Sequence, residues 1–158
     1  PIFLYVGRVA GEKTVDEFLA LALPGTKVVV GDGPRRAELQ RRFPDARFLG
    51  VHRGEDLVRL YRAADVFVFP SRTDTLGLVS IEALACGVPV AAYPVPGPMD
   101  VIGDSGAGAL DEDLRAAALA ALEIRPEVCR ARALDFNWET SARTFVDIIL
   151  RSNRGTAG

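Results

Sequence analysis

Short apolar runs alternate with helical patterns along most of the chain, and this alternation constrains the fold more than any other feature. The runs are rich in β-branched and aromatic residues and end at glycine or polar residues, which predicts strands. We expect these strands at residues 2–6, 27–30, 47–49, 66–69, 88–92 and, as a shorter sixth, 108–110. Strands joined through helices by loops of a few residues form a parallel sheet with helices on both faces. The sequence therefore predicts a Rossmann-like, three-layer α/β/α fold, with the fully apolar run 66–69 as a central strand.

The segments between these runs carry helix-boundary signals. Thr14 and Glu17 have the spacing of a capping box, so a helix is expected to start at Thr14 and to stop at Pro24-Gly25. Pro34 is expected to open the next helix, through about Phe43. A helix at 55–62 should turn Leu57, Leu60 and Tyr61 inward. Further helices are expected at 78–86, 111–123, 126–133 and 138 to about 151, the last with Asn137 as its N-cap.

The composition is that of an ordinary globular protein. The 158 residues are 49% hydrophobic and 25% charged, which predicts one domain that comprises the whole chain. The net charge of −2 does not favour nucleic acid or a membrane surface as a main partner. Cys86 and Cys129 lack a metal-like spacing and are interpreted as buried free thiols in a reducing cytoplasm. Because Pro1 is not an initiator, we expect the chain to start inside a longer protein.

The loop after the first strand brings two cations to the carboxyl edge of the expected sheet, where ligands bind in such folds. Arg8 offers a planar fork for phosphate oxygens, and Lys13 offers a compact charge. Lys13 stands out because all but two of the 19 cations are Arg. This pattern favours a diphosphate site. The alternative is a solvated loop in which Lys13 pairs with a neighbour such as Glu17.

A second loop, residues 73–77, leads from the central strand into an apolar helix. Gly77 allows the backbone to approach a ligand, and the unpaired N–H groups near Gly77 and Leu78 attract an anion. Asp74 lies in this loop and Glu82 about one turn into the helix, where a carboxylate can accept hydrogen bonds from sugar hydroxyls. A Glu in so apolar a helix needs partners. The alternative is that Asp74 caps the helix and Glu82 pairs with an Arg.

Two further loops carry weaker signals. The turn at residues 31–34 contains Gly33 but is not the G-x-G-x-x-G dinucleotide fingerprint, because no third glycine follows at the required spacing. His52, the only histidine, lies in a loop that could contact a base, or it is an exposed bystander. With one histidine and no nucleophile elbow, no Ser-His-Asp triad can be argued.

Six segments, in order, carry a family resemblance: GRVAGEK, VVVGDGP, FLG, YRAADVFVFPS, TDTLGLVSIEALACGVPVAAY and VPGPMDVI. Together they resemble retaining glycosyltransferases of family four, also called glycosyltransferases group one, from residue 3 to about 102. Within that family the chain is similar to a bacterial, mannosyltransferase-like subgroup. The resemblance implies the donor-binding half of a two-domain GT-B enzyme, without the N-terminal acceptor-binding domain. The alternatives are a nucleotide-binding module without catalysis, a sugar-nucleotide epimerase of the same fold, and a structural domain without a ligand.

The resemblance also implies roles for individual residues. The family has two glutamates separated by seven residues, and here Asp74 takes the first place and Glu82 the second. Asp74 would hold the donor sugar, Glu82 the ribose hydroxyls, and Arg8 with Lys13 the diphosphate. The loop at residues 50–57 would border the base. The implied catalytic residues are Arg8, Lys13 and Asp74, and the implied donor-binding residues are Gly7, Gly33, Val51, His52, Leu57, Thr75, Leu76, Gly77, Leu78 and Glu82.

The mechanism implied by the resemblance is front-side sugar transfer with retention of configuration. The nucleoside diphosphate departs, and its growing charge is stabilised by the two cations. Neither a metal nor another cofactor is expected, because Arg8 and Lys13 supply the charge of a divalent ion. The donor is expected to be GDP-mannose, with UDP-sugars next. We expect a cytoplasmic enzyme, which as a full protein could lie peripherally at the inner face of the membrane.

Overall fold

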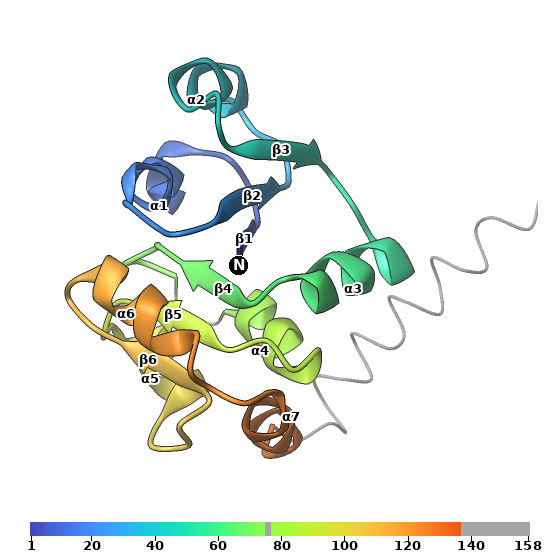
Figure 1. Cartoon of the computed structure of the whole chain (residues 1–158), viewed down its shortest axis with the longest axis vertical. Coiled ribbons are helices and arrows are strands. Elements are labelled where there is room, and N and C mark those ends of the chain that lie inside the picture. Colours follow the sequence, from blue (N-terminus) through green and yellow to red (C-terminus); the bar gives the residue numbers. More distant parts are fainter. Residues whose placement is uncertain (75–76, 137–158) are drawn as a thin grey trace, which may run out of the picture.

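The computed structural model describes residues 1–74 and 77–136. Within them, six strands form one sheet in the order β3-β2-β1-β4-β5-β6, and every adjacent pair is parallel (Figure 1). The strands are β1 (Ile2–Val6), β2 (Thr26–Val30), β3 (Arg47–Gly50), β4 (Val66–Phe69), β5 (Val90–Ala92) and β6 (Gly108–Leu110). All six predicted strands are confirmed, three with the predicted bounds and three with shifts of one or two residues at an end. The central position predicted for residues 66–69 is also confirmed, since β4 pairs with β1 on one side and β5 on the other.

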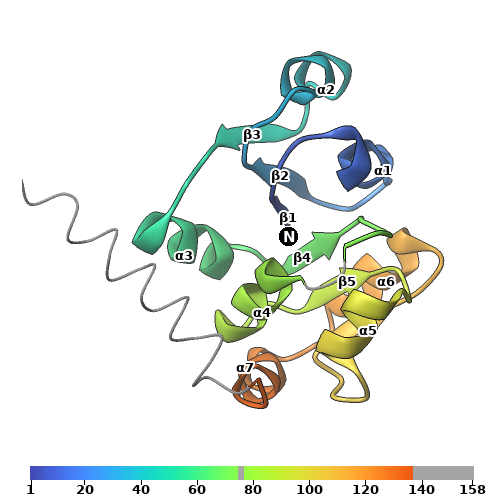
Figure 2. The same ribbon diagram turned by 180° about the vertical axis from the view of Figure 1, so that it is seen from behind.

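Helices cover both faces of this sheet. They are the 3-10 helix η1 (Gly11–Lys13) and α1 (Val15–Ala20), α2 (Arg36–Arg42), α3 (Gly54–Ala63), α4 (Leu78–Ala85), α5 (Pro96–Ile102), α6 (Leu114–Ala121) and α7 (Pro126–Leu134). Figures 1 and 2 show α3, α4 and α7 on one side of the strands and α1 and α6 on the other. The predicted three-layer α/β/α architecture is therefore confirmed.

Two apolar clusters fill the spaces between the layers, and the alternation of side chains along the strands separates them. In β1, Leu4 and Val6 face the cluster under α3, α4, α5 and α7, whereas Phe3 and Tyr5 face the one under α1, α2 and α6. All four residues of β4 are buried, two in each cluster. A strand that is apolar on both faces is what a central strand between two helical layers requires.

The loops after β1 and β2 pack backbone against backbone. The Gly7 N–H donates to the Val30 carbonyl at 3.0 Å, and the Val9 N–H donates to the Asp32 carbonyl at 2.9 Å. A Cβ on Gly31 would lie 1.9 Å from the Gly7 carbonyl oxygen, and the φ of Gly31 is +135°. A Cβ on Gly33 would lie 2.3 Å from the Val9 carbonyl oxygen. These glycines are needed for close loop packing at the carboxyl edge of the sheet.

The predicted capping box at Thr14 is wrong. Thr14 has a left-handed backbone, with φ 49°, and its side chain makes no cap hydrogen bond; its hydroxyl donates to the Pro70 carbonyl at 2.7 Å. Glu17 instead accepts a hydrogen bond from the Tyr93 hydroxyl. Both side chains that matched the local motif have their partners elsewhere in the fold, just after the ends of neighbouring strands.

Helix α5 was not predicted, because its sequence opens with Pro96-Gly97-Pro98. Proline is tolerated in a first helical turn, where the backbone N–H has no partner within the helix. Two other helices start later than predicted, α2 at Arg36 and α6 at Leu114, where Asp113 accepts hydrogen bonds from the next turn. The predicted helix from Trp138, with its cap Asn137, lies outside the described residues.

Across the described part of the chain, no helix is both long and apolar enough to cross a membrane. The two cysteines are not bonded to each other. Cys129 is buried, as predicted, whereas Cys86 is only partly buried.

Replacing Gly31 with Ala tests the loop packing. The new Cβ would collide with backbone, and the φ of this position is disfavoured for a residue with a Cβ, so we expect the free energy of unfolding to fall by about 2–4 kcal/mol. Gly11→Ala is the matched control, because a Cβ there meets nothing within 4 Å. We expect it to change stability by less than about 1 kcal/mol. Urea unfolding of both variants measures the difference, and equal stability of the two would contradict the packing argument.

Candidate functional site

A pocket of about 300 Å³ opens at the carboxyl edge of the sheet, between the loop after β1 and the start of α4. Its lining comprises Tyr5, Val6, Gly7, Arg8, Lys13, Phe69, Ser71, Asp74, Gly77, Leu78 and Val79. Six of the residues predicted to bind the donor are thus brought to one place, from segments about 60 positions apart: Gly7, Arg8, Lys13, Asp74, Gly77 and Leu78.

An ion pair crosses this pocket. The Lys13 ammonium lies 2.6 Å from the Asp74 carboxylate, and each side chain is just over one quarter exposed. Lys13 therefore does not pair with Glu17, as the alternative interpretation of its loop proposed. Asp74 binds this ammonium and makes no cap hydrogen bond to the described residues of α4. The pair joins the two loops whose residues were singled out from the sequence.

The segment after Lys13 is tied to the neighbouring strand ends. Besides the bond from Thr14 to the Pro70 carbonyl, the Tyr93 hydroxyl donates to Glu17 of α1. The Arg72 guanidinium lies 3.5 Å from the centre of the Tyr93 ring, as in a cation–π contact. Burial, together with Glu17, raises the pKa of Tyr93 to about 12, so its hydroxyl stays a donor at neutral pH. These contacts hold the start of α1, and with it Lys13, against the ends of β4 and β5.

Tyr5 lies beneath the loop that carries Arg8, and sequence reasoning did not single it out. Its hydroxyl donates to the Arg8 carbonyl at 2.8 Å. Burial raises its pKa, and the negative charges of Asp74 and Glu12 raise it further. A Cβ on Gly7 would lie 2.8 Å from the Tyr5 hydroxyl oxygen. The predicted binding residue Gly7 thus has a structural role as well, since it leaves room for the hydroxyl that holds the Arg8 backbone.

The start of α4 forms one wall of the pocket. Gly77 is the N-cap and provides no side-chain cap, and the first N–H groups of a helix have no partners within it. Beneath them lies the Ser80 hydroxyl, which is buried and has no hydrogen-bond partner among the described residues. A helix start of this kind attracts anions. Thr75 and Leu76, which were also predicted to bind the donor, lie outside the described residues.

Glu82 lies on α4, about one turn beyond Val79 of the pocket wall, and its side chain meets α3. Its carboxylate accepts a hydrogen bond of 2.9 Å from the Tyr61 hydroxyl. Burial raises the pKa of Glu82, and the bond from Tyr61 partly offsets that shift. In the described part of the structure no Lys or Arg forms an ion pair with this carboxylate, so the alternative of an Arg partner is not supported.

The remaining predicted residues do not line the pocket. Gly33 packs on the Val9 backbone, and Val51 is exposed. One His52 ring nitrogen lies 3.2 Å from the Leu49 carbonyl oxygen, and Leu57 packs against the core from α3. Their roles in binding stay predictions.

The titratable groups of the pocket are few. Arg8, Lys13 and Asp74 carry its charges, and the Tyr5 hydroxyl lies beside them. Among residues 1–74 and 77–136, no group of three or more His, Cys, Asp or Glu side chains is arranged to hold a metal ion.

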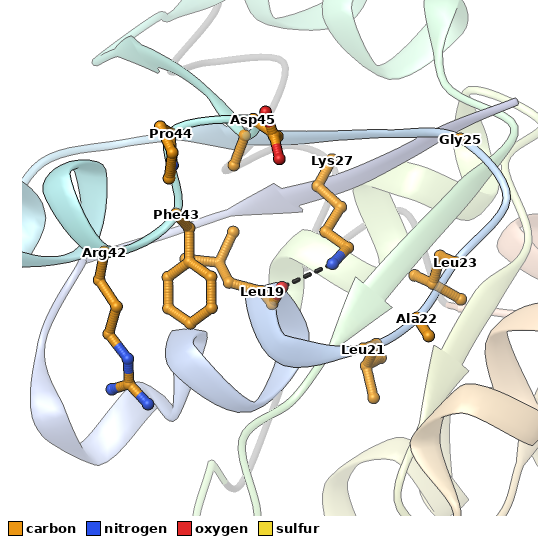
Figure 3. Close-up of a pocket in the computed structure, with 11 residues that line it drawn as sticks. Leu19, Leu21, Ala22, Leu23, Gly25, Lys27, Arg42, Phe43, Pro44 and Asp45 are labelled. Carbon is orange, nitrogen blue, oxygen red and sulfur yellow. Dashed lines mark hydrogen bonds between the residues drawn. The ribbon is translucent and has the colours of Figure 1, made fainter.

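A second pocket, of about 380 Å³, lies near the start of β2, between the end of α1 and the end of α2. Figure 3 shows Lys27 reaching from β2 to the Leu19 carbonyl, to which it donates a hydrogen bond of 2.5 Å. Arg42 turns away from Lys27 in this view and lies 5.1 Å from the centre of the Phe43 ring. Lys27 thus binds the last turn of α1, and the cations of this pocket do not converge on one point. Its features are those of a structural contact.

Comparison with known proteins places the chain in a family. Residues 1–125 match the family model described as glycosyl transferases group 1. A GDP-mannose-dependent alpha-mannosyltransferase of Mycobacterium tuberculosis is 45% identical over 65% of this chain and 28% of its own length. One of the same name from Corynebacterium glutamicum is 37% identical over 95% of this chain and 40% of its own length. A D-inositol 3-phosphate glycosyltransferase of Saccharomonospora viridis is 40% identical over 70% of this chain and 29% of its own length.

Solved structures agree with this result. Sucrose-phosphate synthase from Thermosynechococcus elongatus has a TM-score of 0.73 at 28% identity, over 99% of this chain and 46% of that one. A pneumococcal O-GlcNAc transferase solved with UDP and GlcNAc has a TM-score of 0.72 at 19% identity, over 95% of this chain and 35% of that one. The chain thus spans less than half the length of each of these proteins, from 28% to 46%. Since the family model covers most of its residues, the chain belongs to the glycosyl transferases group 1 family.

Proposed function

We propose that this chain is the donor-binding domain of a glycosyltransferase that transfers a sugar from a nucleoside diphosphate sugar with retention of configuration. The observation that carries the proposal is the pocket that gathers Arg8, Lys13, Asp74 and the start of α4 at the carboxyl edge of the sheet. Such an edge is where parallel α/β sheets bind ligands. Family membership supports the same reaction class.

In this proposal, the diphosphate lies between the two cations and the first N–H groups of α4. An Arg fork, a Lys ammonium and a helix start are complementary to phosphate oxygens. The same groups stabilise the charge that develops on the leaving diphosphate, which is the main catalytic contribution of this domain. The proposed transfer requires no metal ion or other cofactor, because Arg8 and Lys13 neutralise that charge.

Asp74 is proposed to bind hydroxyls of the donor sugar. Its carboxylate lies 2.6 Å from the Lys13 ammonium, and donor binding is proposed to rearrange this pair. A phosphate oxygen takes over the ammonium, and Asp74 becomes available to the sugar. The shorter side chain, an Asp where the family more often has Glu, lies one methylene nearer the backbone and would therefore select a different set of hydroxyl contacts.

The base and ribose are proposed to lie toward α3. Glu82 accepts hydrogen bonds from the ribose hydroxyls, and the loop with Val51 and His52 borders the base, with Leu57 behind it. Gly33, Thr75 and Leu76 complete the proposed donor contacts.

The names of the two mannosyltransferase relatives favour GDP-mannose as the donor. Thermal-shift screening with GDP, UDP and ADP identifies the base, because a ligand that binds only the folded state raises the melting temperature.

The acceptor is proposed to bind a separate N-terminal domain, because the chain spans only 28% to 40% of these relatives. The full protein is proposed to act in the cytoplasm.

The isolated chain should bind the donor and transfer nothing. Transfer that appears when the remainder of the full-length protein is restored would separate an enzyme from a binding module, whereas a product formed by this chain from nucleotide sugar alone would indicate an epimerase.

Two substitutions at the ion pair should change nucleoside diphosphate affinity in opposite directions. Lys13→Ala removes a charge-assisted contact, and we expect it to weaken binding by about 1–3 kcal/mol. Asp74→Asn removes the carboxylate that competes for Lys13, and we expect it to strengthen diphosphate binding by about 0.5–1 kcal/mol. Isothermal titration measures both changes.

The control for these substitutions is Arg41→Ala, which removes an exposed cation near the end of α2 and should leave the affinity unchanged. A nucleoside without phosphates should be indifferent to all three variants. Unchanged affinity in Lys13→Ala would show that Lys13 is a bystander, and weaker binding in Asp74→Asn would show that the carboxylate orients Lys13 rather than competing with the diphosphate.

Glu82→Gln separates binding from folding. The folded-state pKa of Glu82 is raised, so ionising this side chain costs stability as the pH rises through its unfolded and then its folded pKa. Gln lacks that cost and can still accept from Tyr61, so we expect stability at pH 7 to be unchanged or higher. Nucleotide binding should fall by about 1–2 kcal/mol through loss of charge-assisted bonds. Unchanged affinity with a loss of several kcal/mol of stability would refute the ribose assignment.

A further inference from the structure

The hydroxyl of Tyr61 is a buried donor to Glu82. Tyr61 is 1% exposed, and its oxygen lies 2.9 Å from Oε2 of Glu82 and 3.3 Å from the Val79 carbonyl oxygen. A tyrosine hydroxyl has a single proton to donate, and the carboxylate is the nearer and more strongly charged acceptor. Oε1 of Glu82 receives no hydrogen bond from the described residues, so acceptor capacity is left for a ligand.

The Tyr61 ring is held in place by aromatic packing. Its centre lies 5.9 Å from that of Phe67, with the rings inclined by 54°, and Phe67 lies 6.4 Å from Phe69 of the pocket lining. Inclined rings at these separations attract one another. The hydroxyl is therefore a fixed point, whereas a free Glu side chain has several rotamers whose ordering costs entropy.

We infer that Tyr61 is a positioning residue for nucleotide recognition. Its hydroxyl holds the Glu82 carboxylate in one orientation, so that the carboxylate is ready to accept hydrogen bonds from the two ribose hydroxyls of the donor. Tyr61 itself does not touch the nucleotide. The inference rests on the proposed ribose role of Glu82 and adds the group that orients this carboxylate.

The test measures ribose discrimination by the 158-residue chain. For whichever of GDP, UDP and ADP binds best, the ratio of its affinity to that of its 2′,3′-dideoxy analogue is determined in wild type, Tyr61→Phe, Glu82→Gln and the double variant. We expect Tyr61→Phe to reduce this ratio about two- to tenfold, the scale of one hydrogen bond. Tyr93→Phe is the matched control, since it removes another tyrosine hydroxyl that donates to a glutamate, and it should leave the ratio unchanged.

The variants distinguish failure of this inference from failure of the proposed function. If no nucleoside diphosphate binds, or if Glu82→Gln keeps the full ratio, the proposed ribose role of Glu82 is wrong and the inference falls with it. If Glu82→Gln lowers the ratio but Tyr61→Phe keeps it, the inference alone is overturned.

Tyr61→Phe alone leaves the Glu82 carboxylate without its hydrogen-bond donor and could therefore fail to fold. The double variant avoids this problem, because Glu82→Gln removes the carboxylate. It should have the ratio of Glu82→Gln, since Tyr61 acts through Glu82. A lower ratio in the double variant would show that Tyr61 acts independently, and would overturn the inference.

Discussion

The parallel pairing of β1 with β4 is the constraint on which the candidate site depends. Phe3 pairs with Val66 and Leu4 with Phe67, so two segments far apart in sequence end side by side at one edge. The loop after β1 carries Arg8 and Lys13, and the loop after β4 carries Asp74. The strand order brings the two loops to one edge, where the ion pair of 2.6 Å joins them. A different neighbour for β1 would leave the cations of this pocket without the start of α4.

The segments in and beside the pocket are held by polar contacts behind it. Tyr5 holds the Arg8 backbone, Thr14 ties the Lys13 segment to Pro70, and Tyr61 binds Glu82. Each of these three contacts uses a hydroxyl as the donor. Hydroxyls of this kind carry no charge at neutral pH, so they fix the geometry without adding a net charge to the site.

Much of the fold was predictable, because strand periodicity and short connections leave few arrangements of a parallel sheet. The strands and the central place of β4 followed from local patterns, and so did the inward direction of Tyr61. The errors arose where tertiary partners override a local motif. Thr14 and Glu17 match a capping box, yet the Pro70 carbonyl and Tyr93 take both side chains. Pro96-Gly97-Pro98 suggests a break in the chain, whereas the first turn of α5 tolerates proline.

The candidate site was predictable in its position but not in its contacts. Because both loops follow parallel strands, Lys13 and Asp74 were expected at the same edge of the sheet. Nothing in either loop, however, indicates that the two side chains bind each other. Tyr61 has the position of a core residue in an amphipathic helix, and its hydroxyl partner on α4 cannot be seen in that pattern. The binding role of Gly33 stays a prediction, and its packing contact with Val9 could not be seen in the sequence.

A crystal structure of the chain with the nucleoside diphosphate that binds it best tests the central claim most directly. The account predicts phosphate oxygens within hydrogen-bond distance of Lys13 and of the first N–H groups of α4, with Asp74 released from the ammonium. A nucleotide bound in the pocket between α1 and α2, or one that leaves the pair of Lys13 and Asp74 intact with its phosphates elsewhere, would contradict it.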